Sequence, residues 1–297
     1  MTGAEVLRRV KAPVTDKTGR LAPLKAAALF LVVLPGAVLL IRMLSDDLGG
    51  NAYLAAIRDT GIWAIRLIVI TLAVTPLRRL LAWPKLVTVR RMLGVAALVY
   101  SILHLVVYAA DRAFEVATIA KEVMGLSLLV GTIALIAMIP LGATSTDAMV
   151  RRLGGNRWRT LHKLVYAVGV LAVVHYYLLL AKLSTMEATV EAGLFVLLMA
   201  YRALYAATGS RGLPLWSLAS LSIASGFAAM GIEAGYFGLR TNIDPWAVLS
   251  ANFTLDAGLR PGWWVMIIGL GFVAAGVARE WQQRGKGRPS RPAVAAT

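Results

Sequence analysis

Long runs of apolar residues, separated by short polar segments, dominate the hydropathy pattern of this chain. About 20 consecutive apolar residues cross a bilayer as an α-helix, and lipid offers no partner to backbone groups that a helix leaves unpaired. The runs therefore predict eight spans in an all-α fold, a polytopic membrane helical bundle. The predicted spans are Pro23–Leu44, Gly61–Pro76, Met92–Ala110, Val123–Leu141, Leu161–Ala181, Ala192–Thr208, Leu213–Ile232 and Gly262–Val277. Pro76 is expected to mark the end of the second span.

Composition and charge agree with this class. Hydrophobic residues make up 59% of the chain and charged residues 15%. The formal net charge of +16 would suggest nucleic acid as a partner of a soluble protein. Here, however, the basic residues cluster in alternate connections and at both termini, as cytoplasmic segments facing anionic lipid do. We therefore expect a lipid bilayer as partner, no nucleic acid, and both termini in the cytoplasm. The absence of cysteine excludes disulfides, cysteine-ligated iron–sulfur clusters and covalent haem attachment.

The three histidines of the chain are the strongest functional signal. His104 and His175 lie in the outer halves of two spans that cross in the same direction, which places them at similar depth. Ionisable side chains inside a membrane are costly and usually functional, and neutral imidazole is a common axial ligand of haem iron. The pair predicts one b-type haem clamped between two helices. The alternative is that each histidine only forms a hydrogen bond with a neighbouring helix.

His162 opens the fifth span at its inner end, 13 residues before His175. On a straight helix this separation is about 20 Å along the axis and about 140° around it, so the two side chains would not share a groove. Arg90 lies 14 residues before His104, about 40° from the same helix face and at the depth of His162. Arg90 and Arg91 are therefore candidates to neutralise haem propionates or a flavin phosphate. The alternative is that both arginines are cytoplasmic anchors of their span.

Two further residues are candidates for cofactor binding. Arg66 lies within the second span, where a propionate or another acidic group is its expected partner. The alternative is that Arg66 extends to the outer interface. Trp158 lies among basic residues at the inner mouth of the fifth span, which suits an anionic planar cofactor but also an ordinary interfacial belt. No soluble nucleotide-binding domain is visible, so NAD(P)H is not expected to bind this chain.

Several short motifs share their order, spacing and flanking residue types with a known family. They are Thr60-Gly61, Ala64-Ile65-Arg66, Thr75-Pro76-Leu77, Arg90-Arg91-Met92-Leu93-Gly94, Leu103-His104-Leu105, Thr144-Ser145-Thr146, Ala148-Met149, Leu153-Gly154, Trp158, Leu161-His162, Leu164-Val165-Tyr166 and His175-Tyr176. In these motifs the chain resembles the MsrQ (YedZ) family of the ferric-reductase-like transmembrane superfamily. The resemblance covers about residues 20–207. The family pattern has six spans, so Gly212–Thr297 departs from it.

The resemblance implies a haem b membrane subunit that also uses FMN and carries one or two haems. Such subunits take electrons from the respiratory quinone pool of the bacterial inner membrane. They pass them to MsrP, a periplasmic molybdopterin-dependent reductase that repairs methionine sulfoxide in envelope proteins. By position, His104 and His175 match the outer haem ligands and His162 the third family histidine. Arg90 and Arg91 match the paired arginines of the family. The chain is then an electron-transfer subunit of an oxidoreductase system, with no catalytic residue of its own.

Four segments follow from these inferences. They are a cytoplasmic N-terminal segment (1–22), a ferric-reductase-like haem-binding transmembrane domain (23–208), an extension with two transmembrane helices (209–278) and a disordered basic tail (279–297). Two other functions remain open. A stand-alone ferric or quinone reductase of the same superfamily would not depend on a periplasmic partner. A transporter or assembly scaffold would be colourless when purified.

Overall fold

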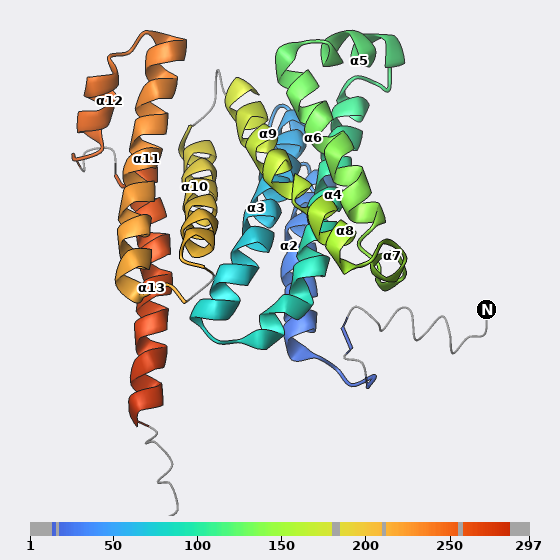
Figure 1. Cartoon of the computed structure of the whole chain (residues 1–297). Coiled ribbons are helices and arrows are strands. Elements are labelled where there is room, and N and C mark those ends of the chain that lie inside the picture. The colour runs from blue at the N-terminus through green and yellow to red at the C-terminus, as the bar shows by residue number, and fades with distance from the viewer. Residues whose placement is uncertain (1–13, 16–17, 180–184, 210–211, 255–257, 286–297) are drawn as a thin grey trace, which may run out of the picture.

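A computed structural model describes residues 14–15, 18–179, 185–209, 212–254 and 258–285, and these form helices joined by short connections (Figure 1). The elements are α2 (Pro23–Leu44), α3 (Ala52–Leu80), the short 3-10 helix η1 (Pro84–Leu86), α4 (Val87–Asp111), α5 (Val116–Val123), α6 (Leu126–Ala143), α7 (Asp147–Leu153), α8 (Gly155–His162), α9 (Leu164–Leu179), α10 (Met186–Ala207), α11 (Leu215–Thr241), α12 (Pro245–Ala251) and α13 (Pro261–Gly285). Within the described residues, eight helical segments are long and apolar enough to cross a membrane. The prediction of a polytopic all-α bundle is confirmed.

Side-chain caps start several helices outside their apolar runs. The side chain of Asn51 accepts a hydrogen bond from the backbone N–H of Leu54, so α3 begins nine residues before the predicted Gly61. Thr146 caps α7 in the same way by accepting from the backbone N–H of Met149. Several spans predicted from hydropathy, such as Gly61–Pro76 and Gly262–Val277, are shorter than the helices that contain them, because hydropathy marks only the apolar part of a helix.

Pro76 does not end the second span, contrary to the sequence prediction. It lies inside α3, which continues to Leu80. A proline lacks the N–H that would bond the carbonyl four residues earlier, and that carbonyl belongs to Leu72. Arg202 of α10 donates to the Leu72 carbonyl at 2.6 Å and replaces the missing backbone donor. Neighbouring helices commonly satisfy a carbonyl that proline frees inside a membrane.

The fifth predicted span is not one continuous helix. It is interrupted at Lys163, which separates α8 from α9. The backbone N–H of Lys163 bonds Thr160, and that of Tyr166 bonds Lys163, both with the tighter i to i+3 spacing. The last two residues of the prediction, 180 and 181, lie outside the described residues.

The predicted disordered tail begins too early in the chain. α13 continues to Gly285, so residues 279–285 are helical. Arg279 donates to the carbonyl of Leu80 at 2.8 Å, which satisfies a group at the end of α3 that α3 itself cannot satisfy. Residues 286–297 of the predicted tail, and residues 1–13 and 16–17 of the N-terminal segment, lie outside the described residues.

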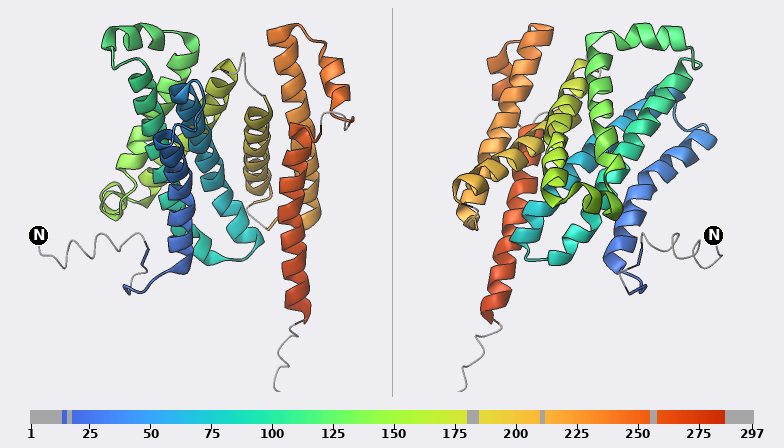
Figure 2. Two further views of the ribbon diagram at one scale, coloured as in Figure 1. Left: turned by 180° about the vertical axis from the view of Figure 1, so that it is seen from behind. Right: turned by 45° about the vertical axis from the view of Figure 1, so that its right-hand side comes forward.

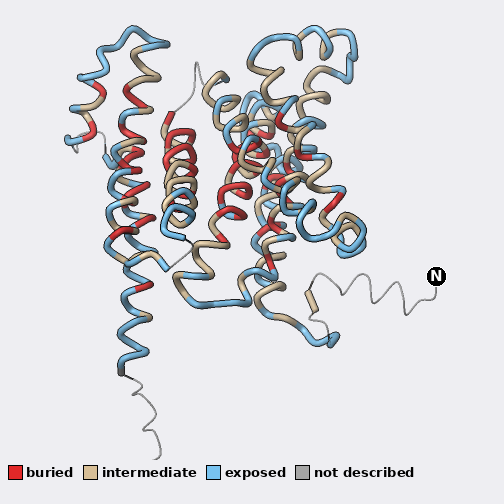
Figure 3. Tube along the Cα trace, in the orientation of Figure 1, coloured by how far each residue is buried: buried red, intermediate tan, exposed pale blue. Residues whose placement is uncertain are grey.

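The helices form two groups with α10 between them. One group contains α2, α3, α4, α6 and α9, and the other contains α11 and α13, which pack on each other and on α10 (Figures 1 and 2). Buried residues concentrate on the facing sides of α3, α10 and their neighbours (Figure 3). The largest core cluster joins α3 and α4 through residues such as Leu72 and Ala97. We name the two ends of the bundle by their short helices, the α5 end and the α7 end.

A buried ion pair organises the C-terminal extension. Glu233 of α11 is 3% exposed and accepts from Arg260 at 2.9 Å, and Asn252 also donates to it, at 3.3 Å. Farther along the same two helices, Gly226 and Gly262 let the backbones approach, since a Cβ on Gly226 would lie 2.8 Å from the Gly262 carbonyl. These contacts fix α13 against α11, and both helices also pack directly on α10.

We expect Arg260→Met to lower the free energy of unfolding in detergent by about 3–5 kcal/mol, because it leaves the Glu233 carboxylate buried without its charge partner. The double variant Glu233→Met/Arg260→Met should recover most of this loss, because it removes both charges. Unfolding monitored by circular dichroism measures both changes. A double variant no more stable than Arg260→Met would contradict the assigned role of the pair.

Candidate functional site

His104 of α4 and His175 of α9 face each other in the bundle. Their ring centres are 6.3 Å apart and the ring planes cross at 88°. Both helices run toward the α5 end, and each histidine lies in the second half of its helix (Figure 1). These two histidines are 71 positions apart in the sequence, and only their predicted depth in the membrane had paired them. The structure brings them together.

A backbone carbonyl holds each of these two rings. The Nδ1 atom of His104 lies 2.8 Å from the carbonyl oxygen of Ile57, and the Nδ1 atom of His175 lies 2.7 Å from that of Ser127. A carbonyl oxygen only accepts hydrogen bonds, so both Nδ1 atoms carry the proton. The Nε2 atom of each neutral ring therefore has the free lone pair. This arrangement is typical of metal-ligating histidines.

A glycine stands four residues after each of these carbonyls and makes room for the ring. A Cβ on Gly131 would lie 2.5 Å from His175, and a Cβ on Gly61 would lie 3.0 Å from His104. Any side chain at Gly131 would displace the imidazole. The two histidines therefore occupy equivalent seats, one on α3 and one on α6, each built from a helix carbonyl and the glycine that follows it by one turn.

The chemistry of this pair is that of two neutral nitrogen ligands. Among the described residues, no cluster of three or more His, Cys, Asp or Glu side chains could hold a bare metal ion. Two imidazoles suffice for a metal whose remaining ligands come from a macrocycle. The site therefore fits a metalloporphyrin better than a free ion.

His162 occupies a separate site at the α7 end. Its ring stacks on Trp158 with centres 3.8 Å apart, and its Nδ1 atom lies 3.1 Å from the Trp158 carbonyl. Its Nε2 atom lies 3.5 Å from the hydroxyl of Ser145. The indole N–H of Trp158 donates to the carbonyl of Thr144 at 2.9 Å, which fixes the stack against the end of α6. His162 does not join the other two histidines.

Positive charge gathers near His162. Arg90 and Arg91 lie within electrostatic range of it, and Arg90 also lies within range of Arg202. Arg91 forms an ion pair with Asp147 at 2.7 Å. Arg202 stands over the ring of Tyr166, 5.6 Å from its centre. Because these positive charges lie close together, this end of the bundle favours the binding of an anion.

Arg66 belongs to a different cluster, which contains its acidic partners. It pairs with Glu187 at 3.6 Å and with Glu191 at 3.7 Å, both on α10. Tyr176 donates to Glu187 at 3.1 Å, and Arg58 pairs with the same carboxylate at 3.2 Å. A propionate or another acidic group was the expected partner of Arg66, and the structure provides acidic side chains. One Glu191 oxygen is buried with no hydrogen-bond partner among the described residues.

A half-buried acid, Glu122, ties α5 to the end of α4, one turn after His104. The hydroxyl of Tyr108 and the guanidinium of Arg112 both donate to the Glu122 carboxylate and hold its pKa below the usual value. Glu122 is therefore ionised at neutral pH, and the contact keeps α5 close to the pair of histidines.

Sequence reasoning missed Arg202, Glu187 and the glycine seats. Arg202 lies inside an apolar run and Glu191 directly before the same run, a signal that could have identified them. Gly61 and Gly131 carry no such signal, because the need for a glycine arises only from a ring on another helix.

Comparison with known proteins gives the family. Residues 60–173 match the model of the ferric reductase like transmembrane component. A 185-residue segment is 38% identical to a protein of Azospira oryzae, covering 62% of this chain and 79% of that protein. A protein of Ralstonia nicotianae is 39% identical over 63% of this chain and 88% of its own length.

A third relative, from Rhodospirillum rubrum, is 40% identical over 204 residues, which are 68% of this chain and 93% of that protein. All three carry the name protein-methionine-sulfoxide reductase heme-binding subunit MsrQ. No solved structure matches the chain. With this identity over most of the length of its relatives, the chain belongs to the MsrQ family of ferric-reductase-like membrane proteins.

Proposed function

We propose that this chain is a haem-binding membrane subunit that carries electrons from membrane quinols to a periplasmic methionine sulfoxide reductase of the MsrP type. The relatives are named heme-binding subunits of a protein-methionine-sulfoxide reductase. The observation that carries the proposal is the separation of His104 and His175, 6.3 Å between ring centres. Metal–imidazole bonds of about 2 Å on both sides of one iron place two ring centres about 6 Å apart.

His104 and His175 would hold a b-type haem, which supplies a reversible one-electron couple when bound. The carbonyls of Ile57 and Ser127 keep the proton of each ring on Nδ1 and make Nε2 a better ligand. Gly61 and Gly131 let the rings approach those carbonyls.

A second, anionic planar cofactor would lie at the α7 end, and the charges there favour FMN. Arg90, Arg91 and Arg202 would neutralise its phosphate, and the stacked pair of Trp158 and His162 provides an aromatic surface. A second haem at His162 would have one imidazole ligand, because the other two histidines face each other.

We propose that the α7 end faces the cytoplasm of a bacterium and the α5 end the periplasm. Basic residues gather on α7, α8 and the connection from α3 to α4, as expected for cytoplasmic segments. Both chain termini then lie in the cytoplasm. The paired histidines lie toward the periplasmic side, from which electrons leave for the reductase. Residues 23–208 form the electron-transfer domain, and 209–278 an accessory extension.

The first prediction for this function concerns the haem ligands. His104→Ala and His175→Ala should each abolish the b-type α-band in a dithionite-reduced-minus-oxidised spectrum of the purified protein. His162→Ala should retain it, because His162 lies at another site. With quinol as donor, the first two variants should also fail to support methionine sulfoxide reduction by the periplasmic reductase.

A wild-type protein that is folded but colourless would contradict the proposal. Equal activity without the reductase would favour a stand-alone ferric or quinone reductase.

The second prediction concerns the glycine seat of His175. Gly131→Ala should cost about 1–3 kcal/mol of stability, because the added methyl overlaps the ring. It should also lower haem occupancy, measured as pyridine haemochrome per protein. Gly231→Ala is the matched control, since a Cβ there meets nothing within 4 Å. Equal haem content in the two variants would argue against the seat.

The third prediction concerns the anionic cofactor. Arg90→Gln should lower the FMN content, measured by flavin fluorescence after denaturation, because it removes a positive charge near His162. The α-band of the haem should be unchanged. Arg152→Gln, at an exposed position on α7, is the control. Loss of haem absorbance with no change in flavin would instead assign this end to a second haem.

A further inference from the structure

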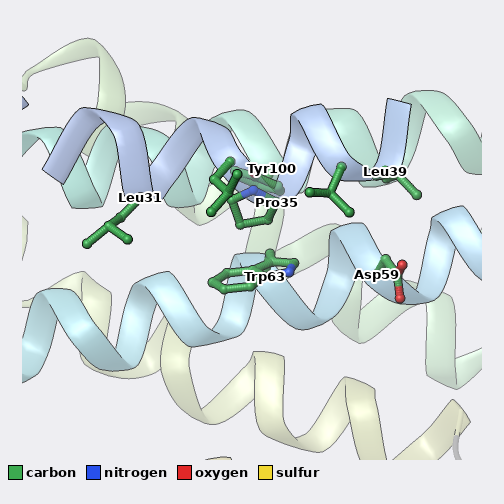
Figure 4. Close-up of a pocket in the computed structure, with 8 residues that line it drawn as sticks. Leu31, Pro35, Leu39, Asp59, Trp63 and Tyr100 are labelled. Carbon is green, nitrogen blue, oxygen red and sulfur yellow. The ribbon is translucent and has the colours of Figure 1, made fainter. Parts of the chain in front are cut away.

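A lipid-facing cavity lies between α2, α3 and α4 and is not used by the sites described above. Its volume is about 300 Å³, within the range of small-molecule sites. Leu34 and Val38 line it from α2, Asp59 and Trp63 from α3, and Tyr100 from α4. In Figure 4, Trp63 and Asp59 project from α3 toward α2, with Trp63 below Pro35 and Asp59 below Leu39.

The cavity opens on the side of the bundle that faces lipid. Leu34 and Val38 are 41% and 45% exposed on a helix that spans the membrane. A ligand would therefore enter from the bilayer and must itself be lipid-soluble. The predominantly apolar walls suit a hydrophobic ring or chain.

Two aromatic side chains that are held in place and one carboxylate determine which ligands the cavity can bind. The Tyr100 hydroxyl accepts from the backbone N–H of Gly36 and donates to the carbonyl of Val32, both at 2.8 Å, so its ring is held as a wall. Arg66 stands over Trp63 at 5.2 Å and holds the indole. Asp59 is the acidic group of the lining, and the Arg42 guanidinium lies 3.5 Å from it. Asp59 lies two residues before the predicted start of the second span at Gly61, and its side chain is 37% exposed, so a proton that it accepts can pass to water at the α5 end.

The cavity adjoins the seat of His104. On α3, Asp59 and Trp63 line the cavity, while Ile57 and Gly61 on the opposite side of the same turns contact the His104 ring. On α4, Tyr100 lies one turn before His104, about 6 Å along the helix. A molecule in the cavity is thus separated from the paired histidines by one layer of helix.

We propose that this cavity binds the ring of a membrane quinol and that Asp59 accepts the protons of its hydroxyl groups. The proposal rests on the function proposed above. Oxidation of one quinol to a quinone breaks two O–H bonds and releases two protons and two electrons. Asp59 takes each proton in turn and passes it to water at the surface. A haem held by His104 and His175 would supply a one-electron acceptor, so the two electrons would leave the quinol one at a time, the first passing on to the periplasmic reductase before the second is taken up.

Asp59→Asn tests the proton acceptor. With decylubiquinol as donor, haem reduction followed by stopped-flow absorbance should slow about a hundredfold, the effect of losing a general base. Reduction by dithionite, which needs no proton acceptor in the cavity, should be unchanged. Asp46→Asn is the matched control, an exposed acid in the loop before α3. Wild-type rates in Asp59→Asn with quinol would overturn the role of Asp59.

Leu34→Trp and Leu40→Trp test the cavity itself. Both positions lie on α2, but only Leu34 lines the cavity, and Leu40 is 56% exposed to lipid. An azidoquinone should label peptides of α2 and α3 on photolysis, and Leu34→Trp but not Leu40→Trp should abolish the label. Labelling elsewhere, or displacement of the azidoquinone by phospholipid as readily as by quinone, would make the cavity a lipid site and overturn the proposal. Normal haem spectra in these variants would leave the proposed function intact, whereas a protein without haem would remove both.

Discussion

The hydrogen bond from an imidazole N–H to a helix carbonyl is the interaction on which this site depends. The Ile57 and Ser127 carbonyls already accept within their own helices, and each can accept a second bond through its other lone pair. A histidine reaches such a carbonyl only where no Cβ covers it, which is why Gly61 and Gly131 stand one turn later. This constraint fixes the tautomer and position of both rings before any cofactor binds. The geometry of the pair is therefore a property of α3 and α6 as much as of the helices that carry the histidines.

The same rule, that every backbone polar group needs a partner in lipid, explains other side chains of the bundle. Pro76 frees the Leu72 carbonyl, and Arg202 satisfies it from α10. Near Pro35, the Tyr100 hydroxyl is inserted between the N–H of Gly36 and the carbonyl of Val32. Both replacements connect helices that are distant in sequence. Arg202 thereby links the backbone of α3 to the positive charge around Arg90, so one side chain serves both the fold and the candidate cofactor site.

Hydropathy predicted the membrane class and every span. Polar groups are costly in lipid, so each span must consist mostly of apolar residues, and such runs are visible in the local sequence. Counting the depth of each histidine along its span was enough to pair His104 with His175. Hydropathy did not predict the break at Lys163 or the continuation of α3 through Pro76. Both depend on hydrogen bonds that become visible only when neighbouring helices are in place. The partners of Arg66 were missed for the same reason, since Glu187 and Glu191 approach it only after α10 packs on α3.

Charged residues are distributed differently at the two ends of the bundle. At the α7 end, Arg90 and Arg91 lie within electrostatic range of His162, and Arg90 also lies within range of Arg202. Toward the α5 end, Arg58 and Arg66 are matched by Glu187 and Glu191, and Arg42 is matched by Asp59. An anionic cofactor is therefore favoured at the first end, whereas at the second end each of these acids lies beside an arginine. Because the seat of His104, Asp59 and the lipid-facing cavity share the turns of α3 between Ile57 and Trp63, the proposed quinol oxidation and electron exit would both occur on that side.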